Sequence, residues 1–502
     1  NGRVHGVVCK VKVKGLALRH GRIDGLERIY DVTIVGNLNH DIQRKRAHSL
    51  RKIAALNDRY TVRIFTGVWG EEYNRVLSQS KIVFNQSIRG EMNMRAYEAT
   101  ACGALLFMEE DNLEINDFFK DRVECVLYNE DNLEEFIEYY LTHDEERERI
   151  AEAGYQRVQQ ETQRHHFERL VALLQERNVA PALRDGDEEL AAERRDHKRT
   201  FLDLPEPQRL FRQARQAFEK QRPNGESLQA AEKLLIQVLE HDPAHTETYN
   251  ALGVLNGYYS QLVQDESAKN ELFAKAEQSF AGGLKHGPND ALLLYNLGVL
   301  HVMSGHADPA EAALNQAIQS IEQNQPLQCR ELILPRTFNA FFVEWERIAA
   351  ELIHDPAAAD NARRQLLLHQ CCDWLGDIAT FKELTSTAVE LYRRAIDARP
   401  DLAGRPRHKL AGLLHRLGQT EEAIEQYRQA YAEEPFNTQL WKDLVAILRE
   451  SGRNEEAESV CQELLTIVEA CPAYKESQAW LEESVHEIQL PPVNDETPNA
   501  SS

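Results

Sequence analysis

Residues 89–110, RGEMNMRAYEATACGALLFMEE, decide how the first part of this chain folds. Arg89 and Glu91 come just before a segment that predicts a short helix. Glu98 follows Glu91 by two helical turns, which would place both carboxylates on about the same face. The small residues 101–104 then lead into the apolar run 105–107. A polar loop, a helix, a glycine and a strand in this order are typical of an α/β domain that binds its ligand at the carboxyl ends of its strands.

Composition sets limits on the function. A chain of 502 residues is too long for one hydrophobic core, and its net charge of −23 argues against nucleic acid as a main partner. No apolar run approaches the length of a transmembrane segment. Eight cysteines without a CxxC pair favour a reduced, cytoplasmic compartment. The histidines show no metal-ligand spacing, so we expect neither a metal site nor a cofactor.

Strands and helices alternate across residues 30–177. Strands are predicted at 31–36, 61–65, 81–85, 104–107 and 123–127. The helices between and after them are predicted at 40–56, 71–78, 92–102 and 133–141, with two closing helices at 144–159 and 162–176. Alternation on this scale indicates right-handed crossovers and therefore a doubly wound parallel sheet.

The second half of the chain looks helical and repetitive. Gly418 and Gly452 lie 34 positions apart, as do Leu410 and Leu444, in similar surroundings. A period of 34 residues resembles the tetratricopeptide repeat, and it predicts an all-α solenoid over residues 207–483. Prolines stand where the second helix of a repeat should end: Pro243, Pro288, Pro400 and Pro435. We expect residues 178–206 to form a charged linker, residues 1–29 to be the remnant of a preceding domain or linker, and residues 484–502 to be a disordered tail.

Two groups of basic residues suit a diphosphate. Gly36 and Asn37 end the first strand, and Arg44, Lys45 and Arg46 lie in the first turns of the next predicted helix, whose N-terminus favours anions. A surface basic cluster is the alternative. Arg89 and Arg95 bracket Glu91, and an arginine fork there suits a pyrophosphate leaving group. A local ion pair with Glu91 is the alternative.

Glu98 lies on an otherwise apolar, alanine-rich helix. A carboxylate in such a place needs a hydroxyl or a cation as its partner, because an unpaired buried charge is costly. The diol of a ribose is such a partner. Asn93, in the same block, is a further candidate for binding a nucleotide-sugar.

Three stretches carry a resemblance to a known family: YDVTIVGNLN at 30–39, SQSKIVFNQSIRGEMNMRAYEATACGALLF at 78–107 and EERERIAEAGYQRV at 145–158. They resemble the carboxyl-terminal half of GT-B glycosyltransferases, in particular the bacterial CgeB-like spore-protein group. The resemblance implies a metal-independent retaining transferase in which Glu98 holds the ribose of the nucleotide, Glu91 lies near the sugar, and Arg95 helps to neutralise the diphosphate. The spacing from Glu91 to Glu98 is one residue shorter than the family's usual pair.

Two functions remain open. The first is a glycosyltransferase that moves a sugar from a nucleotide-sugar donor to a protein or glycan acceptor recruited by the repeats. The second is a non-catalytic scaffold that binds a protein partner in the repeat groove and carries a degenerate transferase domain. Because the resemblance covers only one of the two GT-B domains, we expect this chain to be incomplete for catalysis, binding a nucleotide weakly and transferring no sugar.

Overall fold

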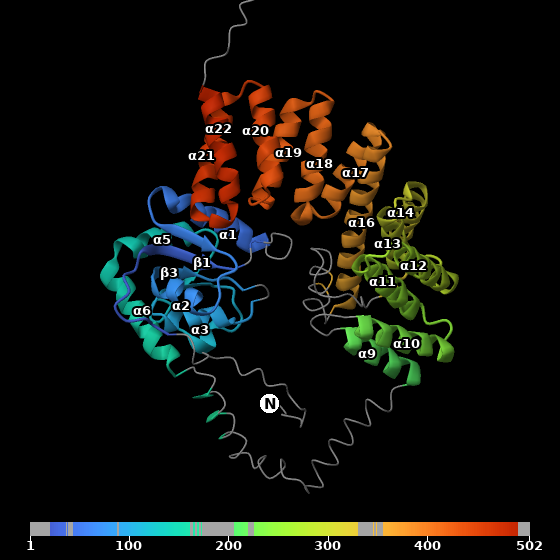
Figure 1. Cartoon of the computed structure of the whole chain (residues 1–502), viewed down its shortest axis with the longest axis horizontal. Helices are drawn as coiled ribbons and strands as arrows, with labels where there is room; N and C mark the ends of the chain where they lie inside the picture. The colour runs from blue at the N-terminus through green and yellow to red at the C-terminus, as the bar shows by residue number, and fades with distance from the viewer. Residues whose placement is uncertain are drawn as a thin grey trace, which may run out of the picture. The chain divides into compact units, whose positions relative to one another are not determined.

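The computed structural model describes residues 21–36, 38, 44–87, 90–160, 164, 165, 168, 169, 172, 205–218, 225–329, 345, 348 and 355–489. Contacts within the chain divide it into two compact units. One consists of Val8–Asp187 with Tyr427–Ser502, and the other of Asn1–Val7 with Glu188–Gln426 (Figure 1).

The first of these units contains a five-stranded sheet in the order β2-β1-β3-β4-β5. Its strands are β1 (Tyr30–Val35), β2 (Val62–Phe65), β3 (Ser80–Phe84), β4 (Leu105–Glu109) and β5 (Val126–Tyr128), and every neighbouring pair is parallel. Val32 at the centre of β1 is in register with Val62 on one side and Ile82 on the other. All five residues of β4 are buried, as expected for a strand covered on both faces.

Helices cover both faces of this sheet. On one face lie α1 (Arg44–Ala55) and α5 (Leu133–Thr142), and on the other lie α2 (Gly70–Ser78), α3 (Met94–Ala101) and α6 (Asp144–Val158) (Figure 1). Two shorter elements, η1 (Leu56–Asp58) and α4 (Ile115–Phe118), complete the domain. The predicted doubly wound α/β fold is confirmed.

The helix α3 is short because both its ends are specified locally. Asn93 caps its start by accepting a hydrogen bond from the amide of Ala96. At its end, Gly103 adopts a φ of 76°, and the amides of Gly103 and Ala104 donate to the carbonyls of Thr100 and Ala99. Such a left-handed residue closes the last turn and is most easily supplied by glycine.

The structure corrects three expectations. Glu91 lies in the loop before α3, so helical periodicity does not place it on the same face as Glu98. The fifth strand begins at Val126 rather than at residue 123, because the chain first turns, with the amides of Val123 and Glu124 bonded to the carbonyl of Lys120. The last helix, α22 (Gln478–Gln489), continues past the expected start of the tail at residue 484.

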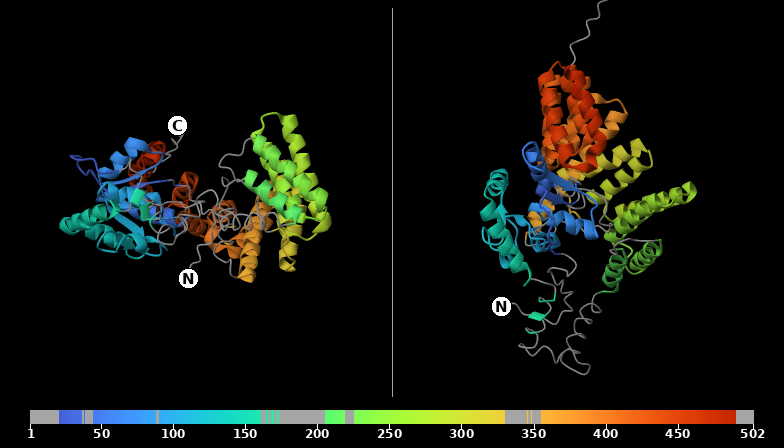
Figure 2. Two further views of the ribbon diagram at one scale, coloured as in Figure 1. Left: turned by 90° about the horizontal axis from the view of Figure 1, so that it is seen from below. Right: turned by 60° about the vertical axis from the view of Figure 1, so that its left-hand side comes forward.

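The other unit is helical. Its helices are α9 (Glu206–Phe218), α10 (Gly225–His241), α11 (Thr246–Leu262), α12 (Glu266–His286), α13 (Ala291–Met303), α14 (Ala307–Glu322), α16 (Pro356–Phe381), α17 (Thr385–Ala398), η3 (Pro400–Leu402) and α18 (Gly404–Arg416), and α19 (Thr420–Glu433) begins in it. Helices that follow one another in the chain pack side by side, as the two views of Figure 2 show for α11 to α14. Segment 162–176 and most of 326–354 lie largely outside the described residues.

Small residues permit the close pairing of these helices. A Cβ added to Gly253 on α11 would lie 2.4 Å from Cε1 of Phe280 on α12. A Cβ on Gly298 of α13 would lie 2.6 Å from Cγ of Leu314 on α14. Atoms cannot approach so closely, so a large side chain of the second helix takes the space that glycine leaves on the first. The prolines Pro243, Pro288 and Pro400 each follow the end of a helix, as predicted.

The remaining helices belong to the unit that holds the sheet: α20 (Thr438–Glu450), α21 (Asn454–Ala470), η4 (Pro472–Ser477) and α22. Trp441 is fully buried, and its indole nitrogen donates to the carbonyl of Pro435 over 2.8 Å. Within this unit α21 contacts α1. The guanidinium of Arg51 donates to Glu463 over 2.8 Å and lies 4.3 Å from the ring centre of Tyr431.

Within the described residues, none of the helices combines the length and the apolar character needed to cross a bilayer.

Candidate nucleotide-sugar site

Two arginine side chains converge at the carboxyl end of β1, the second strand of the sheet. Gly36 follows β1, and its amide donates to the carbonyl of Phe65 at the end of β2 over 2.9 Å. A Cβ added to Gly36 would lie 3.4 Å from Nη1 of Arg46 and 3.4 Å from Nη2 of Arg95. The guanidinium groups of α1 and α3 therefore lie close to the same point of the backbone.

Arg46 is buried, with 7% of its surface exposed, and Nη2 donates to the carbonyl of Gln86. Burial, and then the charge of Arg95, lower the pKa of Arg46 to about 10, against the opposing effect of Glu109 and Glu91. The side chain still carries its charge at neutral pH. Two neighbouring positive charges in a partly buried place are stabilised by an anion.

Arg95 projects from the first turn of α3. Its Nη1 donates to the side-chain oxygen of Asn85 over 3.3 Å. Its Nε is buried and, within the part of the chain that the structure describes, has no hydrogen-bond partner. A buried donor without a partner is uncommon in proteins and marks a place where a ligand oxygen can bind.

Glu98 lies one turn further along α3 and has a hydroxyl partner from the protein itself. The hydroxyl of Tyr73 on α2 donates to its Oε2 over 2.7 Å. Burial, followed by the charge of Glu98, raises the pKa of Tyr73, so the phenol stays protonated and remains a donor. A hydroxyl or cation partner for Glu98 was expected from the sequence, but Tyr73 was not identified as that partner.

Asn93 has a structural role in α3. Its Oδ1 caps the helix at Ala96 and accepts from Nδ2 of Asn85 over 2.8 Å, while its own Nδ2 donates to Oδ1 of Asn85 over 3.2 Å. These bonds occupy both ends of its amide. Asn93 thus joins the end of β3 to the start of α3.

The other predicted residues are placed only in part. Glu91 is half-buried in the loop before α3. Arg44 and Lys45 are the first two residues of α1, and their side chains lie outside the described part. Asn37 and Arg89 also lie outside the described residues.

An exposed tryptophan after the neighbouring strand β2 was not predicted. Trp69 precedes α2 as its N-cap residue, in the loop that follows β2, and 82% of its surface is exposed. Gly67 and Gly70 on either side of it have φ values of 71° and 64°. Tyr73, the partner of Glu98, comes one helical turn after Trp69. In the sequence, a tryptophan between two nearby glycines was the pattern that could have indicated this residue.

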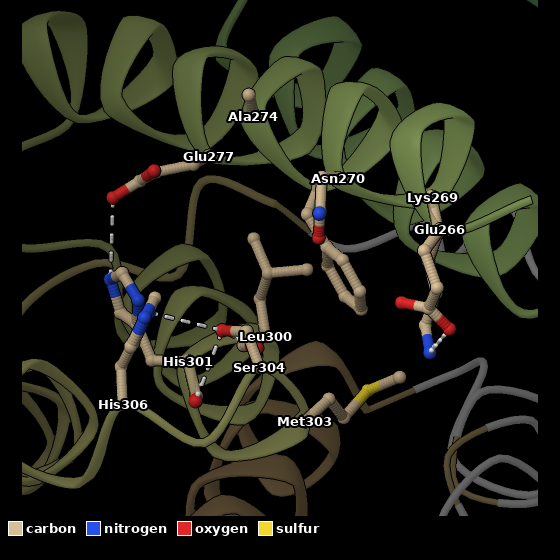
Figure 3. Close-up of a pocket in the computed structure, with 11 residues that line it drawn as sticks. Glu266, Lys269, Asn270, Ala274, Glu277, Leu300, His301, Met303, Ser304 and His306 are labelled. Carbon is tan, nitrogen blue, oxygen red and sulfur yellow. Dashed lines mark hydrogen bonds and ion pairs between the residues drawn. The ribbon is translucent and has the colours of Figure 1, made fainter.

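A pocket of about 410 Å³ lies elsewhere, between α12 and α13 (Figure 3). Its charged groups are largely paired with one another: Nε2 of His301 lies 3.8 Å from Glu277, and Lys269 lies 3.4 Å from Glu266. Burial lowers the pKa of His301. None of the predicted site residues lines this pocket. Across the described ranges, His, Cys, Asp and Glu form no group of three or more that could hold a metal ion.

Comparisons with known proteins identify two kinds of domain in the chain. A family described as glycosyl transferase-like matches residues 23–175, and a tetratricopeptide-repeat family matches residues 414–481. The chain therefore carries a glycosyl transferase-like domain followed by tetratricopeptide repeats. No curated protein matches it.

Several solved structures are similar to the chain. YrrB, described as a TPR protein with an unusual peptide-binding site, is 14% identical over 51% of this chain and 98% of its own, with a TM-score of 0.31. The assembly chaperone of RpL4 is 17% identical over 56% of this chain and 97% of its own, with a TM-score of 0.32. Human IFIT1 is 11% identical over 75% of this chain and 77% of its own, with a TM-score of 0.31. At such low TM-scores these similarities carry no conclusion about ligands or partners.

Proposed function

We propose that the α/β domain binds a nucleotide-sugar and that the protein is a glycosyltransferase whose repeats recruit a protein or glycan acceptor. The observation that carries this proposal is the convergence of Arg46 and Arg95 on Gly36. Ligands of open α/β sheets bind outside the carboxyl ends of the strands, which is where these two cations lie. The match to a glycosyl transferase-like family supports the same reading.

We assign the described side chains to the parts of a nucleotide-sugar as follows. Arg46 and Arg95 would neutralise the diphosphate, Glu98 with Tyr73 would bind the ribose hydroxyls, and the exposed indole of Trp69 would stack on the base. Glu91, in the next loop, would lie towards the sugar. The assignments of Glu98 and Glu91 follow the resemblance to the CgeB-like group of GT-B enzymes.

In this reaction the protein must stabilise a leaving diphosphate. As the bond between the sugar and the diphosphate breaks, negative charge grows on the diphosphate oxygens. Fixed guanidinium groups aimed at that charge lower the barrier, because they need no reorganisation during the reaction. Two arginines can supply this positive charge without a metal ion, and we propose a metal-independent, retaining transfer.

Titration calorimetry of the full chain tests the proposal. Uridine, guanosine, adenosine and thymidine diphosphates, their common sugar conjugates and inorganic pyrophosphate are the ligands. We expect at least one nucleoside diphosphate to bind more tightly than pyrophosphate. Absence of heat with every nucleotide at millimolar concentration would contradict the proposal, and transfer of a labelled sugar to a co-purifying acceptor would extend it to catalysis.

A scaffold function is the second candidate, and the pocket between α12 and α13 favours it. It combines the apolar side chains of Phe273, Leu300 and Met303 with charged groups at its rim, a mixture that suits a peptide side chain. A protein that binds peptides through the repeats but no nucleotide would fit this function instead.

A further inference from the structure

The loop that carries Glu91 is held by a buried carboxylate on the neighbouring strand. Glu109 is the last residue of β4, and only 5% of its surface is exposed. Its Oε1 accepts hydrogen bonds from the amide of Ser87 over 3.0 Å, from the hydroxyl of Ser87, and from Nδ2 of Asn112 over 2.9 Å. Three donors converge on one oxygen of this side chain.

The residues after Glu109 continue these contacts along the same loop. Nδ2 of Asn112 also donates to the carbonyl of Glu91 over 3.2 Å. The amide of Leu113 donates to the carbonyl of Gly90 over 2.9 Å. Oε2 of Glu114 accepts from the amide of Met92 over 2.7 Å. Contacts from residues 109–114 therefore hold the backbone at Gly90, Glu91 and Met92.

Asn112 is itself held firmly. It is 4% exposed, and its Oδ1 accepts from the amides of Glu114 and Ile115 over 3.1 and 2.9 Å at the start of α4. Its side chain thus links the rigid end of β4 to the start of a helix. A group that is fixed on both sides transmits that rigidity to whatever else it binds.

Holding a loop with a buried carboxylate costs free energy. Removing its charge from water is unfavourable, and each hydrogen bond recovers only part of that cost. Oε2 of Glu109 is buried and accepts no hydrogen bond within the described residues. An apolar contact would hold a loop of purely structural purpose at a lower free-energy cost. The arrangement instead suits a loop whose backbone must keep one position.

We propose that Glu109, with Asn112, is a positioning residue that fixes the backbone at Ser87 and at residues 90–92, and thereby the placement of Glu91 against the donor sugar. This inference rests on the proposed function. Glu109 acts through Ser87 and Asn112 and does not itself touch the ligand. It lies on the strand after the helix that holds Glu98, so the sugar end of the site depends on a residue outside the Glu91–Glu98 block.

The test compares two ligands on each of four proteins: the unaltered chain, Glu109→Ala, Glu109→Gln and the control Glu110→Ala at the exposed next position. Calorimetry gives the affinity for a nucleoside diphosphate and for its sugar conjugate. We expect Glu109→Ala to weaken the sugar conjugate by about tenfold or more, the equivalent of a lost charge-assisted hydrogen bond, while the diphosphate changes little. Glu109→Gln retains an acceptor oxygen for Ser87 and should be closer to the unaltered chain.

The outcomes separate this inference from the proposed function. If the unaltered chain binds neither ligand, the proposed function fails and the inference falls with it. A second case is that the unaltered chain binds both ligands while Glu109→Ala weakens the binding of both equally or of neither. In that case Glu109 does not position Glu91, and the inference alone is wrong. Should Glu109→Ala fail to fold, Glu114→Ala, which removes the acceptor for the amide of Met92, must show the same selective loss in smaller measure.

Discussion

The hydroxyl of Tyr73 donates a hydrogen bond to Oε2 of Glu98 over 2.7 Å and so joins α2 to α3 on the same face of the sheet. Glu98 is half-buried, and this bond gives one of its oxygens a fixed partner. It also orients the carboxylate before any ligand arrives. In the proposed function, Glu98 would also accept hydrogen bonds from the ribose hydroxyls.

We expect Glu98→Gln to weaken the binding of a nucleoside diphosphate without unfolding the domain. Glutamine keeps an oxygen that can accept from Tyr73 but loses the charge, and a hydrogen bond to a charged group contributes about 1.5–3 kcal/mol. Calorimetry measures the affinity, and circular dichroism checks the fold. Tyr73→Phe is the companion variant and should retain most of the affinity. Unchanged binding in Glu98→Gln would remove Glu98 from the site.

We expect Arg95→Ala to weaken nucleoside diphosphate and pyrophosphate binding alike but to leave nucleoside binding almost unchanged. The reason is that its guanidinium lies over Gly36, where the diphosphate is proposed to bind. Arg149→Ala on α6, an exposed arginine of the same domain, is the matched control. Titration with the nucleoside, the nucleoside diphosphate and pyrophosphate distinguishes diphosphate binding from a structural role of Arg95. Equal losses for the nucleoside and the diphosphate would point to a structural ion pair instead.

Trp69→Ala should weaken nucleotides but not pyrophosphate. Stacking of a base on an aromatic side chain contributes about 1–3 kcal/mol per base. Because the indole is 82% exposed, its removal should leave the unfolding temperature almost unchanged. Trp69→Phe keeps an aromatic surface and should lose less than Trp69→Ala. Quenching of tryptophan fluorescence by a nucleotide, absent in Trp69→Phe, is an independent readout. A nucleotide affinity unchanged in Trp69→Ala would exclude stacking there.

The repeat helices should lose stability as the pH falls below about 6.5, the ordinary pKa of histidine. His369 on α16 is 2% exposed, and burial lowers its pKa, although its ring bonds the carbonyl of Ala395 over 2.8 Å. The unfolded chain then binds the proton more readily than the folded one, so the free energy of unfolding falls as the pH drops through this range. Urea unfolding at pH 7.5 and pH 5.5 measures the change. His369→Asn should reduce this dependence and His143→Asn, at an exposed position, should not. Equal pH dependence in His369→Asn and the unaltered chain would contradict the prediction.

Local sequence patterns were sufficient to predict most elements of the fold. The strands at 31–36, 61–65 and 81–85 and the helices between them appear within a few residues of their predicted bounds, since burial periodicity and glycine or asparagine ends are local properties. The 34-residue repeat also holds, because Thr420 and Asn454, at the starts of α19 and α21, are 34 positions apart. The predictions were wrong where a turn or a tertiary contact outweighed the local sequence pattern, as at the start of β5.

The candidate site was predicted only in part. Glu98 was proposed because it interrupts an apolar helix, and Arg95 because it and Arg89 bracket Glu91. Arg46 was seen as one member of a basic cluster, and nothing local distinguished it from Arg44 and Lys45. Its burial, and its meeting with Arg95, depend on α1 and α3 reaching the end of β1 from opposite faces of the sheet.

The sequence by itself determined the kinds of element, their order, the repeat period and the glycosyl transferase-like block, because spacing and side-chain chemistry along the chain specify these directly. Only the tertiary structure decided which partners meet: Tyr73 with Glu98, Arg46 with Arg95, and Glu109 with Ser87. Each pair joins different elements, and its distance depends on the strand order β2-β1-β3-β4-β5. That order is set by the burial of apolar surface over the whole domain, which no short stretch of sequence contains.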